Sequence, residues 1–229
     1  MIPTGDTRVR RRTASHQVSA ALIDAAETVL DRDGTDGVTI RAVAQQAAVS
    51  PTSVYNRFEN KDGLIVALAN RTLEQLAKAI DVPQSVGPVE RFRGACRNYR
   101  AFALRHPARY SLIFGGGSPL EDQSSAVADS GRAVFAVLEA LISAMRSSVS
   151  EHDSAESAQI AWSAIHGAVT IEQIGIGQTP DLAVTFEGML DLLVDQLSDT
   201  ATTTLSPCRS AAEPKALAAS VSGCRSVTS

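Results

Sequence analysis

Polar and cationic side chains are concentrated between Ser50 and Lys61 of this 229-residue chain. Hydroxyl, amide and guanidinium groups bind phosphate oxygens and the edges of bases. Ser50 can cap a short helix, and Pro51 suits the first helical position, where no N–H is needed. The segment therefore predicts a helix with an anion-binding end, to which Lys61 adds its charge. Its outward side chains are Thr52, Ser53, Tyr55, Asn56 and Arg57.

No arrangement typical of a catalytic or metal centre is present in the sequence. The four histidines are scattered, and neither a His-Glu-x-x-His nor a Gly-x-Ser-x-Gly motif occurs. The three cysteines lack the spacing of a metal site. Gly115 to Gly117 lack the lysine of a phosphate-binding loop. We therefore expect no enzymatic activity, no metal and no cofactor.

Charge is unevenly distributed along the chain, whose formal net charge is −4. Residues 1–61 contain eight Lys or Arg against seven Asp or Glu, and four of those cations lie in the first twelve residues. A basic arm on an acidic protein suggests contact with phosphates, although a solvated tail has the same composition. We expect residues 1–14 to be a disordered basic arm, which could enter a minor groove but fits better a role in strengthening the positive field. No apolar run marks a signal peptide or a membrane span, so we expect a cytoplasmic protein without membrane contact.

Hydrophobic residues recur at helical spacing along the chain, and no strand period is evident. In the N-terminal part, a helix with Val18 and Leu30 on its apolar face is stopped by Gly34. Thr39 can cap a second, short helix, which is followed after a tight turn by the helix at 51–58. Two short helices joined by such a turn are typical of a helix-turn-helix that reads the major groove. An ordinary three-helix packing unit has the same periodicity.

One string resembles the DNA-binding segment of TetR-family transcriptional regulators: TIRAVAQQAAVSPTSVYNRFENKDGLI. The family pattern has a glycine in the turn, where this chain has Ala48, and a histidine before the phenylalanine, where it has Arg57. A left-handed alanine costs about 1 kcal/mol. The positions in register are Thr39, Val43, Ala44, Ala47, Val49, Ser50, Tyr55, Phe58, Lys61 and Leu64.

The resemblance implies a homodimer that places two such segments in successive major grooves of a palindromic operator. It implies phosphate contacts from Thr39, Tyr55 and Lys61, and base reading near Thr52 and Ser53. Arg41 and Arg57 fit phosphate contacts better than base reading. The expected DNA-binding set is Thr39, Arg41, Pro51, Thr52, Ser53, Tyr55, Asn56, Arg57 and Lys61.

The resemblance also implies an all-α fold of about nine helices. Residues 15–61 would form the three-helix DNA-binding domain, which a fourth helix joins to a ligand-binding and dimerisation domain at 62–199. Residues 200–229 are rich in Thr, Ser and Ala, so we expect a disordered tail.

Trp162, His166 and Gly167 resemble the Trp-x-x-x-His-Gly string of a family subgroup. Trp162 and His166 share a helix face and could contact an effector, but His166 fits a packing role better. The effector implied by the family is a small, largely apolar molecule. The candidate pocket residues are Tyr99, Phe102, Tyr110, Phe114, Phe135, Trp162 and His166, and the candidate dimer contacts are Ile160, Ala164, Ala168, Phe186, Met189, Leu193 and Leu197.

These features together favour a ligand-responsive transcriptional regulator, a repressor released from its DNA operator by the effector. The alternative is a helical dimeric interaction or ligand-sensing protein without specific DNA binding. The three phosphate donors Tyr55, Arg57 and Lys61 argue against this alternative.

Overall fold

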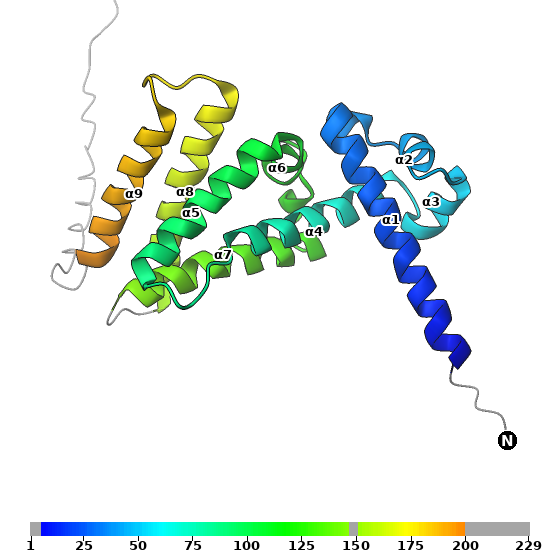
Figure 1. Cartoon of the computed structure of the whole chain (residues 1–229), viewed down its shortest axis with the longest axis horizontal. Coiled ribbons are helices and arrows are strands. Elements are labelled where there is room, and N and C mark those ends of the chain that lie inside the picture. The colour runs from blue at the N-terminus through cyan, green and yellow to red at the C-terminus, as the bar shows by residue number, and fades with distance from the viewer. Residues whose placement is uncertain (1–5, 147–150, 200–229) are drawn as a thin grey trace, which may run out of the picture.

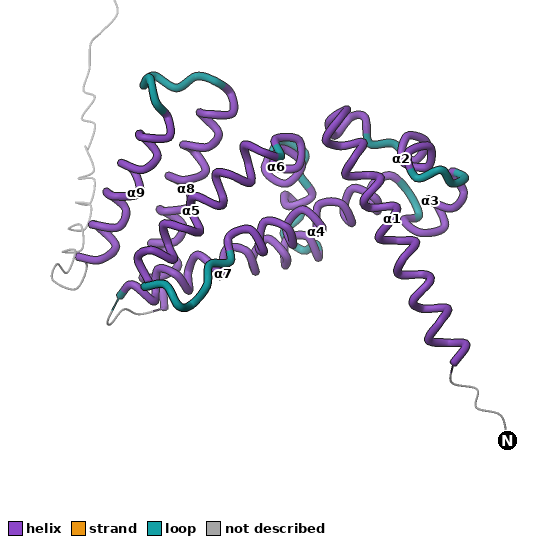
Figure 2. Tube along the Cα trace, viewed as in Figure 1, coloured by secondary structure: helices purple, strands orange, loops and turns teal. Residues whose placement is uncertain are grey.

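The structure is a computed structural model that describes residues 6–146 and 151–199. Within these residues the chain is helical, without strands, as the sequence predicts (Figures 1 and 2). The helices are α1 (Asp6–Gly37), α2 (Ile40–Gln46), α3 (Pro51–Phe58), α4 (Lys61–Ile80), α5 (Pro88–Arg105), α6 (Pro107–Phe114), the 3-10 turn η1 (Pro119–Glu121), α7 (Ala126–Met145), α8 (Glu151–Ile174) and α9 (Leu182–Asp199). The all-α fold of nine α-helices in the described residues is therefore confirmed.

The N-terminal arm differs from the prediction. α1 begins at Asp6, so residues 6–14 are helical and not a disordered arm, and no structural boundary lies at residue 15. The prediction failed because the arginines at 8 and 10–12 were taken as a break from the apolar helix, although arginine is itself a good helix former. Residues 1–5 and the predicted tail at 200–229 lie outside the described residues.

Three caps set the boundaries of the small helices in the N-terminal head, which comprises α1, α2 and α3. Thr39 Oγ1 accepts a hydrogen bond from the Ala42 N–H, and Ser50 Oγ accepts one from the Ser53 N–H. Asn60 Oδ1 does the same for the Gly63 N–H at 2.8 Å. Such caps satisfy N–H groups that a helix start leaves unpaired. They explain why α3 is limited to residues 51–58.

α4 connects the head to the larger helical domain (Figure 1). Its buried residues Leu64 and Leu68 lie near the head, whereas Leu76 and Ile80 lie towards the domain of α5 to α9. α4 packs against α1 and α3 on one side and against α5, α6 and α7 on the other. The head and the domain thus share one continuous hydrophobic core.

Ion pairs attach α5 to the two last helices. Arg100 donates to the Glu172 carboxylate on α8 at 2.5 Å and 2.7 Å. Arg97 makes a similar two-bond contact with Glu187 on α9. Planar guanidinium groups fix orientation through such paired bonds, so α9 is held in register along α5.

Candidate functional site

The outer surface of the head contains the polar side chains that the sequence singles out. On α3 only Val54 is buried, while Thr52, Asn56 and Arg57 are exposed. Tyr55 is 52% exposed, so its side chain is accessible at this surface. This helix therefore presents an exposed polar face beside α2 (Figure 1).

Ser53 lies differently from its neighbours on α3. It is half-buried, and its hydroxyl lies 3.0 Å from the Ser50 hydroxyl within the cap. The sequence expectation that Ser53 points outward to bases is therefore not what the structure favours, and Thr52 has the more accessible hydroxyl. The cap geometry explains the difference, since Ser53 is the third residue of α3 and its hydroxyl is therefore within reach of the Ser50 hydroxyl.

Three cations and one hydroxyl surround this face. Thr39 and Arg41 are exposed at the start of α2, and Lys61 is the exposed first residue of α4. Each lies at a helix N-terminus, where the helix dipole favours an anion. Together with Arg57 on α3, they suit contact with a phosphate backbone.

The turn between α2 and α3 is strained at one position. Ala48 has a φ of 53°, in the left-handed region where glycine is favoured. Its N–H donates to the Gln45 carbonyl, and the next N–H, of Val49, donates to the Ala44 carbonyl. Both bonds pin the turn, so the strain is held in place by the geometry that separates α2 from α3.

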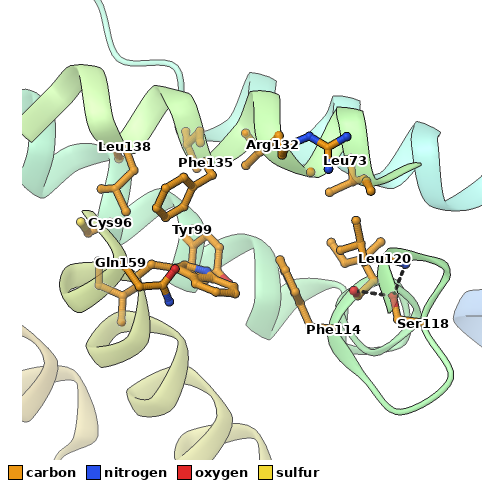
Figure 3. A pocket seen from close by; sticks show the side chains of 18 of the residues that line it. Leu73, Cys96, Tyr99, Phe114, Ser118, Leu120, Arg132, Phe135, Leu138 and Gln159 are labelled. Atoms are coloured by element: carbon orange, nitrogen blue, oxygen red, sulfur yellow. Dashed lines mark hydrogen bonds between the residues drawn. The ribbon is translucent and has the colours of Figure 1, made fainter. Parts of the chain in front are cut away.

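A cavity of about 600 Å³ lies in the larger domain, lined by α4, α5, α6, α7 and α8 (Figure 3). Four of the seven predicted pocket residues line it: Tyr99, Phe114, Phe135 and Trp162. The Phe114 and Phe135 rings lie 6.1 Å and 6.3 Å from the Trp162 ring, so the aromatic groups form one connected wall. A volume of this size is typical of small-molecule sites.

The other three predicted residues do not line the cavity. Phe102 is buried against the His106 ring, with centroids 5.3 Å apart. Tyr110 and His166 instead form a polar cluster behind Tyr99. These three residues therefore lie outside the lining of this cavity, because side chains that share a helix face can contact different neighbouring helices.

Within this cluster, the Tyr110 hydroxyl lies 2.5 Å from His166 Nδ1 and 3.1 Å from the Tyr99 hydroxyl. Burial lowers the pKa of His166 below its ordinary value of 6.5 and raises the pKa of Tyr110 to about 12. The cluster is therefore neutral at physiological pH. It joins α5, α6 and α8 at the aromatic end of the cavity.

The charged groups at the cavity are already engaged by the protein. Arg132 pairs with Asp129 and donates to the Gln123 carbonyl, and Glu121 accepts from the Gly117 N–H at 2.7 Å. The thiol of Cys96, also in the wall, is buried, and burial raises its pKa to about 12. The remaining wall is mostly aliphatic and aromatic, which suits an uncharged ligand.

Several lining residues were not identified from the sequence. Leu73 on α4, Cys96 on α5 and Leu138 on α7 line the cavity but were not among the predicted pocket residues. Gln159 and Arg132 gave no signal, because a single polar residue on a helix is usually solvated. Only packing of five helices brings these residues together.

α8 and α9 each carry exposed apolar side chains that no other part of the described residues covers. Ile160 is 60% exposed, and Ile171 and Ile174 follow it on the same side of α8. On α9, Val184 and Leu192 are also exposed, Leu192 by 69%. Exposed apolar patches of this kind mark interaction surfaces.

The predicted dimer contacts only partly coincide with this face. Ile160 belongs to it, and Ala164 and Ala168 are half-buried. Phe186 and Leu197 are buried in the core of their own chain, which leaves little of either side chain for contact with a second copy. Met189 and Leu193 are half-buried and also pack on that core. The apolar residues of α9 occupy more than one side of the helix, and the sequence did not distinguish them.

Two further observations concern the described residues as a whole. No group of three or more His, Cys, Asp or Glu among them is arranged to hold a metal ion. In the same ranges, no helix has the length and apolar character needed to cross a membrane.

Comparison with known proteins identifies both halves of the chain. Residues 22–68 match the model of bacterial regulatory proteins of the tetR family, and residues 92–193 match the tetracyclin repressor-like C-terminal domain. The chain is 28% identical over 183 residues to the uncharacterized HTH-type transcriptional regulator Rv0681 of Mycobacterium tuberculosis. That similarity covers 74% of this chain and 77% of the relative.

Solved structures show the same fold. A protein of unknown function from Rhodococcus sp. RHA1 has a TM-score of 0.66 and 23% identity, covering 78% of this chain and 94% of that one. BioQ bound to its double-stranded DNA operator has a TM-score of 0.56 and 25% identity, covering 77% and 95%. With both family models matched in order along one chain, this protein belongs to the TetR family of DNA-binding transcriptional regulators.

Proposed function

We propose that the protein is a homodimeric repressor that binds a palindromic operator and leaves it when a small, uncharged, largely apolar effector enters the cavity. The observation that carries this proposal is the presence, in one chain, of an exposed polar reading helix, α3, and an apolar cavity of about 600 Å³. BioQ, which has the same fold, was solved on its operator.

In the proposed complex, α3 enters the major groove with Thr52 and Asn56 nearest the bases. Thr39, Tyr55 and Lys61 bind phosphates, and Arg41 and Arg57 add to these contacts. A helix in the major groove reads bases through its exposed side chains, whereas cations at helix ends supply most of the affinity.

The dimer is proposed to form through the apolar face of α8 and α9. A two-fold interface of this kind pairs each helix with its mate, as in a four-helix bundle. The proposed contact residues are then Ile160 and Ile171 on α8 and Leu192 on α9, rather than Phe186 or Leu197. Residues 15–61 act as the DNA-binding part and residues 62–199 as the ligand-binding and dimerisation part.

We assign Trp162 and His166 different roles within the proposed Trp-x-x-x-His-Gly subgroup. Trp162 lines the cavity and contacts the effector. His166 is held by two tyrosine hydroxyls, which supports a packing role. Gly167, the next residue, is half-buried on α8.

The test is selection of bound duplexes from a random DNA pool by the purified protein at moderate salt. An enriched inverted repeat with half-sites about one helical turn apart supports the proposal. If folded, dimeric protein enriches no sequence, the proposal fails and the protein is a ligand-sensing or interaction protein. An effector titration that leaves operator affinity unchanged removes that effector from the mechanism.

A further inference from the structure

α6 is a short helix whose two sides contact two different parts of the protein. It lies between α5 and the C-terminal half of α1, and it also packs on α4 (Figure 1). Phe114 on α6 lines the cavity, while Arg109 reaches the head. The helix therefore adjoins both the proposed effector site and the DNA-binding head.

On the head side, Arg109 makes a dense set of contacts. Its Nη2 and Nε bind the Asp31 carboxylate at 2.6 Å and 3.0 Å, and its Nη1 donates to Gln75 Oε1 at 2.8 Å. Nη1 also lies 3.4 Å from Glu27 Oε2. Asp31 and Glu27 belong to α1, and Gln75 belongs to α4. One guanidinium thus fixes α6 to both helices at once.

Two of the side chains in this contact are sheltered from solvent. The side chains of Arg109 and Glu27 are only 14% and 11% exposed. Gln75 Nε2 in turn donates to Glu27 Oε1 at 2.6 Å, so Glu27 is held from two helices. A planar donor in paired bonds tolerates little displacement, unlike a lysine, which is a flexible point charge.

On the cavity side, the neighbouring residue Tyr110 is equally fixed. Its hydroxyl binds His166 Nδ1 on α8, and its ring lies 4.9 Å from the Phe114 ring. Phe114 lies 5.1 Å from the His166 ring. α6 is therefore attached to α1 through Arg109 and to α8 through the next residue, Tyr110. Any occupant of the cavity that displaces Phe114 acts on this attached helix.

We propose that Arg109 is the residue that positions the DNA-reading head according to the state of the cavity. A shift of α6 caused by an occupant is carried by the guanidinium to Asp31 and Glu27, and so to α1. The functional meaning of this coupling rests on the proposed function, but the coupling itself is a property of α6 and α1. Arg109 acts through α1 and touches neither DNA nor effector.

The experiment is a double-mutant cycle read by hydrogen exchange of the full-length protein. Phe114→Ala perturbs the cavity side, and amide exchange is measured in the α1 segment 24–33. We expect Phe114→Ala to increase that exchange several-fold in the natural background and to add nothing in an Arg109→Met background. Equal effects of Phe114→Ala in both backgrounds, or no effect in the natural one, would overturn the proposal.

Matched controls separate coupling from loss of stability. Arg97→Met breaks a similar two-bond contact, with Glu187 on α9, and should leave the effect of Phe114→Ala on α1 intact. If Arg109→Met does not fold, Asp31→Asn replaces it in the cycle. This substitution weakens the ion pair at Asp31, its more exposed residue, and should also reduce the coupling. Arg109→Lys keeps the charge without the planar fork, so full coupling in that variant would contradict the role assigned to the guanidinium.

Operator affinity provides the second reading of the same cycle, with the duplex selected from the random pool as probe. Phe114→Ala and Arg109→Met should change affinity non-additively, whereas Phe114→Ala and Arg97→Met should add. If no duplex is selected, the proposed function fails while the exchange experiment still decides whether Arg109 couples α6 to α1.

Discussion

The hydroxyl of Tyr110 lies 2.5 Å from Nδ1 of His166, which ties α6 to α8 beside the aromatic end of the cavity. The imidazole is half-buried, and no carboxylate in the described part of the chain contributes to holding it protonated. A proton on His166 would therefore be opposed by burial, and its Nδ1 could no longer accept a bond from either tyrosine.

This arrangement makes stability depend on pH. Since burial lowers the pKa of His166 in the folded chain, the unfolded chain binds the proton more tightly. The free energy of unfolding should thus fall as the pH drops below about 6.5 towards the lowered pKa. His166→Gln should flatten this decline in urea titrations between pH 5 and 8. His106, whose pKa burial also lowers, leaves a residual slope in that variant, but an undiminished slope would contradict the assignment.

The left-handed alanine in the turn predicts a stabilising substitution. Ala48→Gly should raise the free energy of unfolding by about 1 kcal/mol, because the φ of 53° is unfavourable for a residue with a Cβ atom. Ala47→Gly is the matched control, since Ala47 has an ordinary φ of −84°. This substitution should lower the free energy of unfolding by about 0.5–1 kcal/mol. Thermal unfolding of the natural protein and the two variants measures the sign of each change in stability. A loss of stability in Ala48→Gly would show that the turn is not strained.

The cations around α3 predict a change in salt dependence. Lys61→Ala should weaken operator binding and reduce the slope of log affinity against log salt by about one for each subunit. Lys78→Ala removes the same charge at an exposed position in the last turn of α4, away from the head, and should leave the slope unchanged. Binding measured at several salt concentrations on the selected duplex compares the two. Equal slopes in the two variants would mean that Lys61 binds no phosphate.

Tyr55 offers a separate test of the same surface. Tyr55→Phe removes only the hydroxyl of a side chain that is 52% exposed, so the fold should be retained. A phosphate contact from that hydroxyl predicts a loss of operator affinity of about fivefold to tenfold, or about 1 kcal/mol. Circular dichroism and gel shift on one preparation distinguish lost binding from lost structure.

The apolar face of α8 and α9 predicts the assembly. Leu192→Glu places a charge at a 69% exposed position and should yield monomers in sedimentation velocity, with a helical spectrum that is unchanged. Val86→Glu, at an exposed apolar position in the loop between α4 and α5, should stay dimeric. A dimer that survives Leu192→Glu would locate the interface elsewhere.

The cavity can be probed by its own fluorophore, because Trp162 is the single tryptophan of the sequence. Binding of the neutral dye N-phenylnaphthylamine should quench Trp162 emission. Val134→Phe fills part of the cavity and should weaken this binding about tenfold, equal to about 1.4 kcal/mol. Val137→Phe, on the same helix and packed on the core outside the cavity lining, should have little effect. Equal loss in both variants would indicate that the dye does not use the cavity.

The sequence predicts local structure well where the signal is itself local. Thr39, Ser50 and Pro51 placed the starts of α2 and α3 correctly, since caps and prolines act within one turn. The left-handed Ala48 agrees with the family resemblance, because the family pattern has a glycine at that position of the turn.

Features that depend on packing between helices were predicted less well. Tyr110 and Phe114 lie four residues apart on α6, yet only Phe114 lines the cavity. On α9 the sequence could not tell the buried Phe186 from the exposed Leu192, because both are apolar. The contact of Arg109 with Asp31 joins residues 78 apart, and no local pattern indicates it.

The reading helix buries one of its eight side chains, Val54, in the head. Substitutions at the exposed positions Thr52 and Asn56 therefore change little of the packing that keeps the chain folded. A lineage carrying this head can acquire a different operator by successive point mutations, none of which passes through an unfolded intermediate. The same separation allows an engineer to randomise those positions while keeping the cavity and its response intact.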